Sequence, residues 1–196
     1  MTANGVEAPK ILAFSGSARG DSFNHQLIEN AARMAEEAGA EVRLINLGDF
    51  PMPIMNQDLE RNEGQPKNGT RLKELFIRSD GLLISAPEYN SSITPLLKNA
   101  IDWVSRRVGD EPPLVGYKHK VVALLSASPG RLGGLRGLVH LRSILSYLGA
   151  IVLPEQHAIS SASDAFDGDR KLARESDINR VRSVVNEFVH FTSKLS

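Results

Sequence analysis

The chain has 196 residues, of which 41% are hydrophobic, enough for one well-buried domain and short of two. Lys and Arg together number 23, as do Asp and Glu, so no overall charge favours nucleic acid or an anionic membrane as a partner. Cysteine is absent, which excludes disulfides, thiolate metal sites and cysteine nucleophiles and favours a cytoplasmic protein.

The N-terminal residues show neither periodicity nor a targeting pattern. Residues 1–8, MTANGVEA, lack the basic start and the apolar core of a signal peptide. We expect residues 1–9 to be a flexible tail and residues 10–196 to form a single domain. No apolar run approaches ~20 residues, so the sequence predicts no transmembrane helix.

The first elements alternate between strand and helix. Residues 10–16, KILAFSG, are a short apolar run ending in Gly, the pattern of a buried strand. The helix that follows is marked at both ends, by Ser22 as N-cap and by Gly39 as the C-terminal stop. Residues 41–47 alternate and predict a second strand. Residues 48–67 hold three prolines and no clear period, so they predict an irregular loop.

The rest of the chain continues this alternation. Thr94 as N-cap and Pro95 at the first helical position begin a helix whose buried face includes Trp103. The other predicted elements are a helix at about 68–79, strands at 81–87, 120–128 and 150–154, a helix at 133–149, and a closing helix carrying Ile178, Val181, Val185, Phe188 and Thr192. Continuous apolar strands joined by helices predict a doubly wound α/β domain, with a five-stranded parallel sheet covered by helices on both faces.

The ligand site of such a domain lies beyond the carboxyl ends of the strands, where the strand order reverses. The first segment that this rule selects is FSGSARGDSFN, residues 14–24. It is not a dinucleotide motif, because Ala18 and Asp21 stand where glycines are required, and it lacks the Gly-Lys-Ser/Thr of a Walker loop.

The same segment has the components of a monophosphate site. The hydroxyls of Ser15, Ser17 and Ser22, the guanidinium of Arg19 and the free amides of a helix N-terminus would all donate hydrogen bonds. The alternative is a serine-rich turn that caps the helix while Arg19 is solvated. Asp21 opposes the phosphate interpretation unless its carboxylate points away.

Two further segments occupy the other selected strand ends. In PEYNSSITP, residues 87–95, Glu88 and Tyr89 would border a crevice in which backbone amides bind the polar edge of a flat heterocycle. The alternative is a capped loop with a surface tyrosine. In SASPGRLGG, residues 126–134, three glycines would let the backbone approach a ligand closely, and the alternative is a flexible loop.

Other reactive residues are interpreted as structural. Ser128 lacks the GxSxG elbow of a hydrolase. The histidines have no acidic partner at metal or triad spacing, so we expect surface or packing roles and no metal site. They are His25, His119, His140, His157 and His190.

With these segments in view, the chain resembles the NADPH-dependent FMN reductases, a flavodoxin-like family that includes quinone, azo-dye and chromate reductases. The family's phosphate motif, Gly-Ser-x-Arg-x-x-Ser-x-Asn, is complete here as Gly16, Ser17, Arg19, Ser22 and Asn24. Its flavin segment is similar to residues 87–103, PEYNSSITPLLKNAIDW. The resemblance extends from about residue 10 to about residue 190.

The resemblance implies one flavodoxin-like domain that binds FMN, with NADPH or NADH as co-substrate. The residues that it implies at the FMN phosphate are Ser17, Arg19, Ser22, Phe23 and Asn24. Those that it implies around the isoalloxazine are Pro87, Glu88, Tyr89, Asn90 and Ser91, with Ser128 nearby. Gly20 replaces a basic residue that often follows the motif arginine, so the phosphate charge would depend more on Arg19.

The resemblance also implies a reaction. NAD(P)H would deliver a hydride to N5 of FMN and leave, after which a quinone, free flavin, azo compound or chromate would take the electrons at the same face. No side chain need act as acid or base, so no catalytic residue is predicted, and a shared site predicts ping-pong kinetics.

Partners and rival functions follow from the same comparison. A homodimer or homotetramer is implied, with residues 48–67 and 105–118 as candidate contacts and a small-molecule electron acceptor as the other partner. One alternative is a flavodoxin-type electron carrier that binds FMN without oxidising NAD(P)H, although the acidic surface of flavodoxins is missing here. The other is an α/β binding protein that has lost its flavin.

Overall fold

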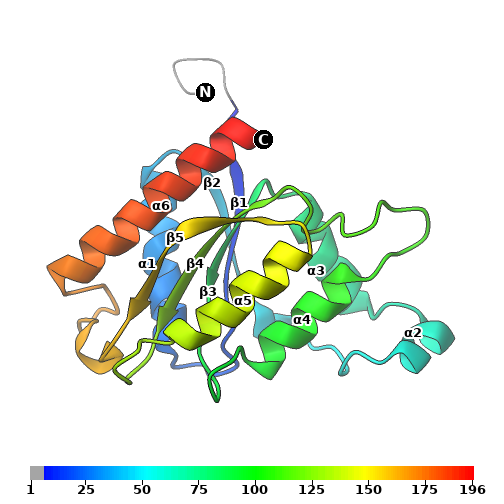
Figure 1. Cartoon of the computed structure of the whole chain (residues 1–196), viewed down its shortest axis with the longest axis horizontal. Coiled ribbons are helices and arrows are strands. Elements are labelled where there is room, and N and C mark those ends of the chain that lie inside the picture. Colours follow the sequence, from blue (N-terminus) through cyan, green and yellow to red (C-terminus); the bar gives the residue numbers. More distant parts are fainter. Residues whose placement is uncertain (1–6) are drawn as a thin grey trace.

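The computed structural model describes residues 7–196, so residues 1–6 of the predicted tail lie outside the described residues. Five strands form one parallel sheet in the order β2-β1-β3-β4-β5 (Figure 1). The strands are β1 Lys10–Ser15, β2 Glu41–Asn46, β3 Gly81–Ser85, β4 Val121–Ala127 and β5 Ile151–Ile159. The order reverses at β1, which lies between β2 and β3, so a ligand crevice is expected above the ends of β1 and β3.

Helices cover both faces of this sheet. Helices α1 and α6 pack on one face, and α3, α4 and α5 on the other (Figure 1). The helices are α1 Phe23–Glu37, α2 Gln57–Glu63, α3 Lys67–Ile77, α4 Pro95–Ser105, α5 Leu135–Tyr147 and α6 Glu175–Leu195. The predicted fold class is therefore confirmed. Within residues 7–196, no helix is both long and apolar enough to cross a membrane.

The central strands are apolar throughout because the sheet separates two hydrophobic cores. Ile11 and Ala13 of β1 enter the core beneath α1 and α6, whereas Leu12 and Phe14 enter the core beneath α3, α4 and α5. Because the strands are packed into both cores, their ends and the loops that follow them are held at fixed positions.

The prediction of an irregular loop at residues 48–67 was wrong in part. Helix α2 begins after Asn56, whose side chain accepts a hydrogen bond from the amide of Asp58 (2.8 Å). No residue of α2 is buried, so the helix has no apolar period that sequence reasoning could detect. The preceding segment is held on α4, where Trp103 Nε1 donates to the carbonyl of Pro53 (2.8 Å).

The fifth strand is longer than predicted. The apolar run ends at Pro154, yet β5 continues to Ile159, because a register shift between Val122 and Leu124 of β4 admits extra residues into this edge strand. Arg142 of α5 donates to the carbonyls of Val152 (3.2 Å) and Pro154 (3.3 Å), which stabilises the irregular part.

Tyr117 predicts a pH dependence of stability. Its side chain is fully buried and its hydroxyl donates to the carbonyl of Ile101 (3.2 Å). Burial, and to a smaller extent the Asp102 carboxylate, raises the pKa of this phenol well above its ordinary value. Because the folded-state pKa is the higher one, this stabilisation is complete below about pH 10 and is lost as the pH rises through the folded-state pKa.

Replacing Tyr117 by phenylalanine is therefore expected to flatten the alkaline decline in the free energy of unfolding. At neutral pH the variant loses one hydrogen bond, which costs about 0.5–1.5 kcal/mol. Urea denaturation of parent and variant at neutral pH and at several values above about pH 10 measures both effects. Parallel declines in the two proteins would contradict the assignment.

Candidate functional site

The turn after β1 is held in place by its neighbours. The amide of Gly16 donates to Ser85 at the end of β3 (2.9 Å), and its carbonyl accepts from Thr94 Oγ1 (2.5 Å). Thr94 also accepts from the amide of Leu97 (3.2 Å), so it caps α4 as predicted. A Cβ at position 16 would lie 2.9 Å from Leu97 Cδ2, which explains why glycine stands there.

The hydroxyls of this turn are oriented by the backbone. Ser17 Oγ accepts from the amide of Arg19 (3.1 Å), and Ser22 Oγ accepts from the amide of Asn24 (3.2 Å), which confirms Ser22 as the N-cap of α1. Each hydroxyl thereby retains a proton that it can donate to a ligand. The amide of Phe23, at the first position of α1, has no acceptor within the helix.

The Arg19 guanidinium lies over the same turn. Its Nη2 donates to the backbone carbonyl of Asp21 (3.0 Å), so the guanidinium contacts the main chain of Asp21. Among the ion pairs of the described residues, none joins the two side chains. Asp21 is also absent from the lining of the cleft described below, which weakens the objection that its carboxylate opposes a phosphate there.

Asn24 has a structural role that the motif does not reveal. Its Nδ2 donates to the carbonyl of Ala127 (2.8 Å), and its Oδ1 accepts from the Ala127 amide (3.0 Å) and from Ser85 Oγ (2.9 Å). The side chain is buried and reaches from α1 to the ends of β3 and β4. Asn24 thus fixes the start of α1 against the sheet.

The segment after β3 forms a tight turn. Tyr89 and Ser92 exchange two backbone hydrogen bonds (2.9 and 3.0 Å). Asn90 and Ser91 between them have φ values of 50° and 67°, in the left-handed region. Both residues lie at the tip of the turn, outside the lining of the cleft described below.

The segment after β4 contains glycines that the protein's own packing requires. Gly133 has a φ of 63°, and a Cβ there would lie 2.7 Å from the carbonyl of Ala158. Ser126 Oγ donates to the carbonyl of Ala86 (2.7 Å), and the amide of Ser128 donates to that of Ile159 (3.0 Å). The positive φ and the close approach of Ala158, rather than a ligand, account for Gly133.

The three segments meet in one cleft of about 100 Å³. The predicted site residues that line it are Ser17, Arg19, Ser22, Phe23, Asn24, Pro87, Glu88, Tyr89 and Ser128. Ala127 and Pro129 also line it and were missed, because their side chains carry no recognisable chemistry. They lie within the segment 126–134, which the strand-end rule had selected.

The comparisons with known proteins identify the family of the chain. A family model described as NADPH-dependent FMN reductase matches residues 9–164. The chain belongs to this family. The predicted family, its fold and its use of FMN with NAD(P)H are therefore confirmed at the level of the family.

Individual relatives cover most of the chain. An NAD(P)H-dependent FMN reductase of Pseudomonas aeruginosa is 37% identical over 83% of this chain and 84% of its own. A quinone reductase of Escherichia coli is 35% identical over 75% and 74% of the two chains. Among solved structures, FerB from Paracoccus denitrificans, a flavoenzyme NAD(P)H:(acceptor) oxidoreductase, has a TM-score of 0.82 at 28% identity. The match covers 96% of this chain and 99% of FerB.

The cleft of this FMN reductase family member fits the phosphate end of FMN. Of its lining residues, Arg19 alone is cationic, and the start of α1 adds the positive end of a helix dipole. A pocket that buries a drug-sized ligand measures about 300 Å³ or more, so this cleft would leave part of FMN exposed. Tyr89, which is 45% exposed, stands at the rim.

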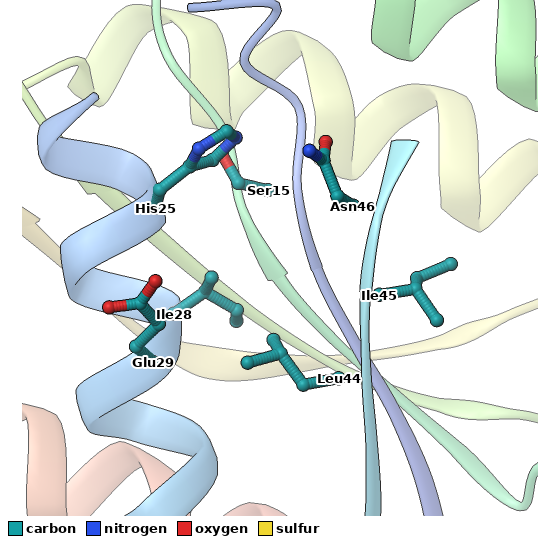
Figure 2. Close-up of a pocket in the computed structure, with 7 residues that line it drawn as sticks. All are labelled: Ser15, His25, Ile28, Glu29, Leu44, Ile45 and Asn46. Atoms are coloured by element: carbon teal, nitrogen blue, oxygen red, sulfur yellow. The ribbon is translucent and has the colours of Figure 1, made fainter. Parts of the chain in front are cut away.

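A larger hollow of about 280 Å³ lies between α1 and β2. Figure 2 shows the polar side chains of Ser15, His25 and Asn46 at one end and the apolar Ile28 and Leu44 at the other, with the carboxylate of Glu29 beside Ile28. No Lys or Arg lines this hollow, so it does not fit a phosphate. The smaller cleft is therefore the candidate phosphate site.

No acidic residue stands at metal or triad spacing from the histidines in the sequence, but the fold brings one to His157, which has a packing role as expected. Its Nε2 lies 2.9 Å from Asp177 Oδ1, and Arg174 pairs with the other carboxylate oxygen of Asp177 (2.6 Å). The three residues join β5 to the start of α6 and do not line the cleft. Across residues 7–196, no group of three or more His, Asp or Glu side chains could hold a metal ion.

Proposed function

We propose that the chain is an FMN-dependent NAD(P)H oxidoreductase that reduces a quinone. The observation that carries this proposal is the cleft at the reversal of strand order, where the Arg19 guanidinium, two serine hydroxyls and the N-terminus of α1 converge. This set of donors matches a phosphate monoester, and membership of the FMN reductase family supports FMN as its source.

The residues of the cleft bind and orient FMN. Ser17, Arg19 and Ser22 would hold the phosphate, while Pro87 and Tyr89 would form a wall beside the ring. When bound, FMN accepts a hydride from NAD(P)H and returns two electrons to an acceptor. Since the chemistry belongs to FMN, the protein contributes position and exclusion of water, and no side chain is assigned as acid or base.

The exposed part of the site supports a quinone as the acceptor. A cleft of about 100 Å³ leaves the ring accessible to a second flat molecule. Relatives named quinone reductase or NADPH:quinone oxidoreductase match this chain at 31–35% identity. The net reaction takes a hydride from NAD(P)H and a proton from solvent, and it yields NAD(P)⁺ and a hydroquinone.

Assembly and location complete the proposal. We expect a homodimer or homotetramer, with residues 48–67 and 105–118 as candidate contacts, and a cytoplasmic location. The first of these segments already packs on α4 through Asn99, whose side chain accepts from the Met55 amide (2.8 Å).

The test is NAD(P)H oxidation by the purified protein reconstituted with FMN. We expect steady oxidation that requires both FMN and a soluble quinone, with parallel lines in double-reciprocal plots as the sign of ping-pong kinetics. A protein that binds FMN but does not oxidise NADPH or NADH would instead be an electron carrier of flavodoxin type. A protein that stays colourless after addition of FMN would overturn flavin binding altogether.

A further inference from the structure

Glu88 borders the cleft, yet both oxygens of its carboxylate are bound within the protein. Arg136 contacts Oε1 through Nε (2.9 Å) and Nη2 (2.6 Å), and the amide of Gly137 donates to Oε2 (3.1 Å). The Glu88 side chain is only 9% exposed. A carboxylate so engaged has little capacity left for a ligand.

These contacts supply something that α5 lacks. Helix α5 follows Gly134, which has no side chain with which to cap the helix, so the amides of its first turn need another acceptor. Gly137 is the third residue of α5, the position whose amide an N-cap side chain usually binds. The Glu88 carboxylate, which comes from another part of the chain, binds the Gly137 amide in place of an N-cap side chain. It also lies at the positive end of the helix dipole.

The turn of residues 87–92 and helix α5 are also closely packed against each other. A Cβ at Gly137 would lie 3.2 Å from the carbonyl oxygen of Ser92 and 3.3 Å from Glu88 Cβ. His140, one turn further along α5, contacts Ser92 Oγ through Nδ1 (3.1 Å). The turn of residues 87–92 is thus attached to α5 near both of its ends.

We propose that Glu88 is a positioning residue that acts through Arg136 and the Gly137 amide. By capping α5, it fixes the turn of residues 87–92 in the conformation that places Pro87 and Tyr89 in the lining of the cleft. Arg136 belongs to this arrangement and contacts no flavin itself. The proposal rests on the proposed function, namely that the cleft binds FMN.

The test is a double-mutant cycle on FMN affinity with Glu88→Ala, Arg136→Ala and the double variant. Without the cap, the turn populates its binding geometry for only a fraction of the time, and the dissociation constant rises by the inverse of that fraction. We expect a rise of about tenfold for Glu88→Ala and about threefold for Arg136→Ala. Because both act through one contact, the double variant should match Glu88→Ala at about tenfold.

Three further measurements distinguish a loss of positioning from a general loss of protein stability. In Glu88→Gln, the amide oxygen can still accept from Gly137, so FMN affinity should lie between that of the parent and that of Glu88→Ala. Asp102→Asn breaks the Lys98–Asp102 pair (2.7 Å) on neighbouring α4 and serves as the matched control. At saturating FMN, the visible circular dichroism of the flavin should match the parent in Glu88→Ala and Arg136→Ala as well as in this control, because bound FMN selects the binding geometry of the turn. A changed spectrum would indicate that Glu88 contacts FMN directly.

Each outcome has a distinct meaning. Parent-like FMN affinity in Arg136→Ala, or a double variant near the product of the two single effects, would overturn the proposal and indicate that Glu88 contacts FMN directly. In the FMN-free protein, hydrogen exchange of the Gly137 amide should be faster in Glu88→Ala, and unchanged exchange would overturn the cap. A parent that binds no FMN would overturn the proposed function instead.

Discussion

Replacing Asn24 by leucine is expected to destabilise the fold by about 3–5 kcal/mol. The leucine side chain has a similar size but offers no hydrogen bond to the amide and carbonyl of Ala127 or to Ser85 Oγ, all of which bind Asn24 in the parent. Each buried polar group left without a partner costs about 1–3 kcal/mol. Urea denaturation followed by far-ultraviolet circular dichroism measures the difference.

The matched control is Asn56→Leu, because Asn56 is also an asparagine that accepts from a backbone amide. Asn56 caps the exposed helix α2, where water can replace its side chain, so the loss there should be about 0.5–2 kcal/mol. Equal losses in the two variants would show that the buried contacts of Asn24 are worth no more than an exposed cap.

Replacing Arg19 by alanine is expected to weaken FMN binding by about 1.5–3 kcal/mol, or roughly 10- to 150-fold. Of the residues lining the cleft, Arg19 alone carries a positive charge, and Gly20 beside it supplies none. The Arg19 guanidinium is exposed and contacts only the Asp21 carbonyl within the described part of the chain, so its removal leaves the fold intact. Quenching of flavin fluorescence at fixed ionic strength measures the affinity.

Riboflavin, which lacks the phosphate, provides the decisive control for Arg19. Its affinity should be the same in the parent and in Arg19→Ala. Arg19→Lys keeps the positive charge but lacks the forked donors of a guanidinium. Its FMN affinity should therefore lie between those of the parent and of Arg19→Ala. Arg61→Ala, which removes an exposed arginine paired with Asp58 on α2, should bind FMN as the parent does. Equal losses of FMN and riboflavin in Arg19→Ala would contradict a phosphate contact.

Much of the site could be predicted because the strand-end rule needs only local information. The apolar strands, the cap at Ser22 and the Thr94-Pro95 helix start are all visible in short windows of sequence, and together they give the order of elements. The rule then selects loops rather than residue types. For that reason it selected the segment containing Ala127 and Pro129, although neither residue carries a chemical signal.

Other features left no local signal. Helix α2 has no buried face, so its residues lack the period that marks a helix. The continuation of β5 beyond Pro154 depends on a register shift against β4, and Arg142 of α5 binds two carbonyls of the irregular part. His157 seemed to have no acidic partner because Asp177 is distant in the sequence and is brought near by the packing of α6 against the sheet.

The sequence by itself determined the doubly wound fold, the family and the loops that form the cleft, since periodicity, caps and motif spacing are properties of neighbouring residues. Only the tertiary structure decided which polar side chains of those loops are already engaged. Asn24 binds Ala127 across 103 residues, and Glu88 binds Arg136 across 48. A motif records that a polar residue is present, but whether it faces a ligand or a partner in the same chain depends on contacts between distant segments. In this cleft that difference separates Arg19, which is open to a phosphate, from Glu88, whose carboxylate holds a helix.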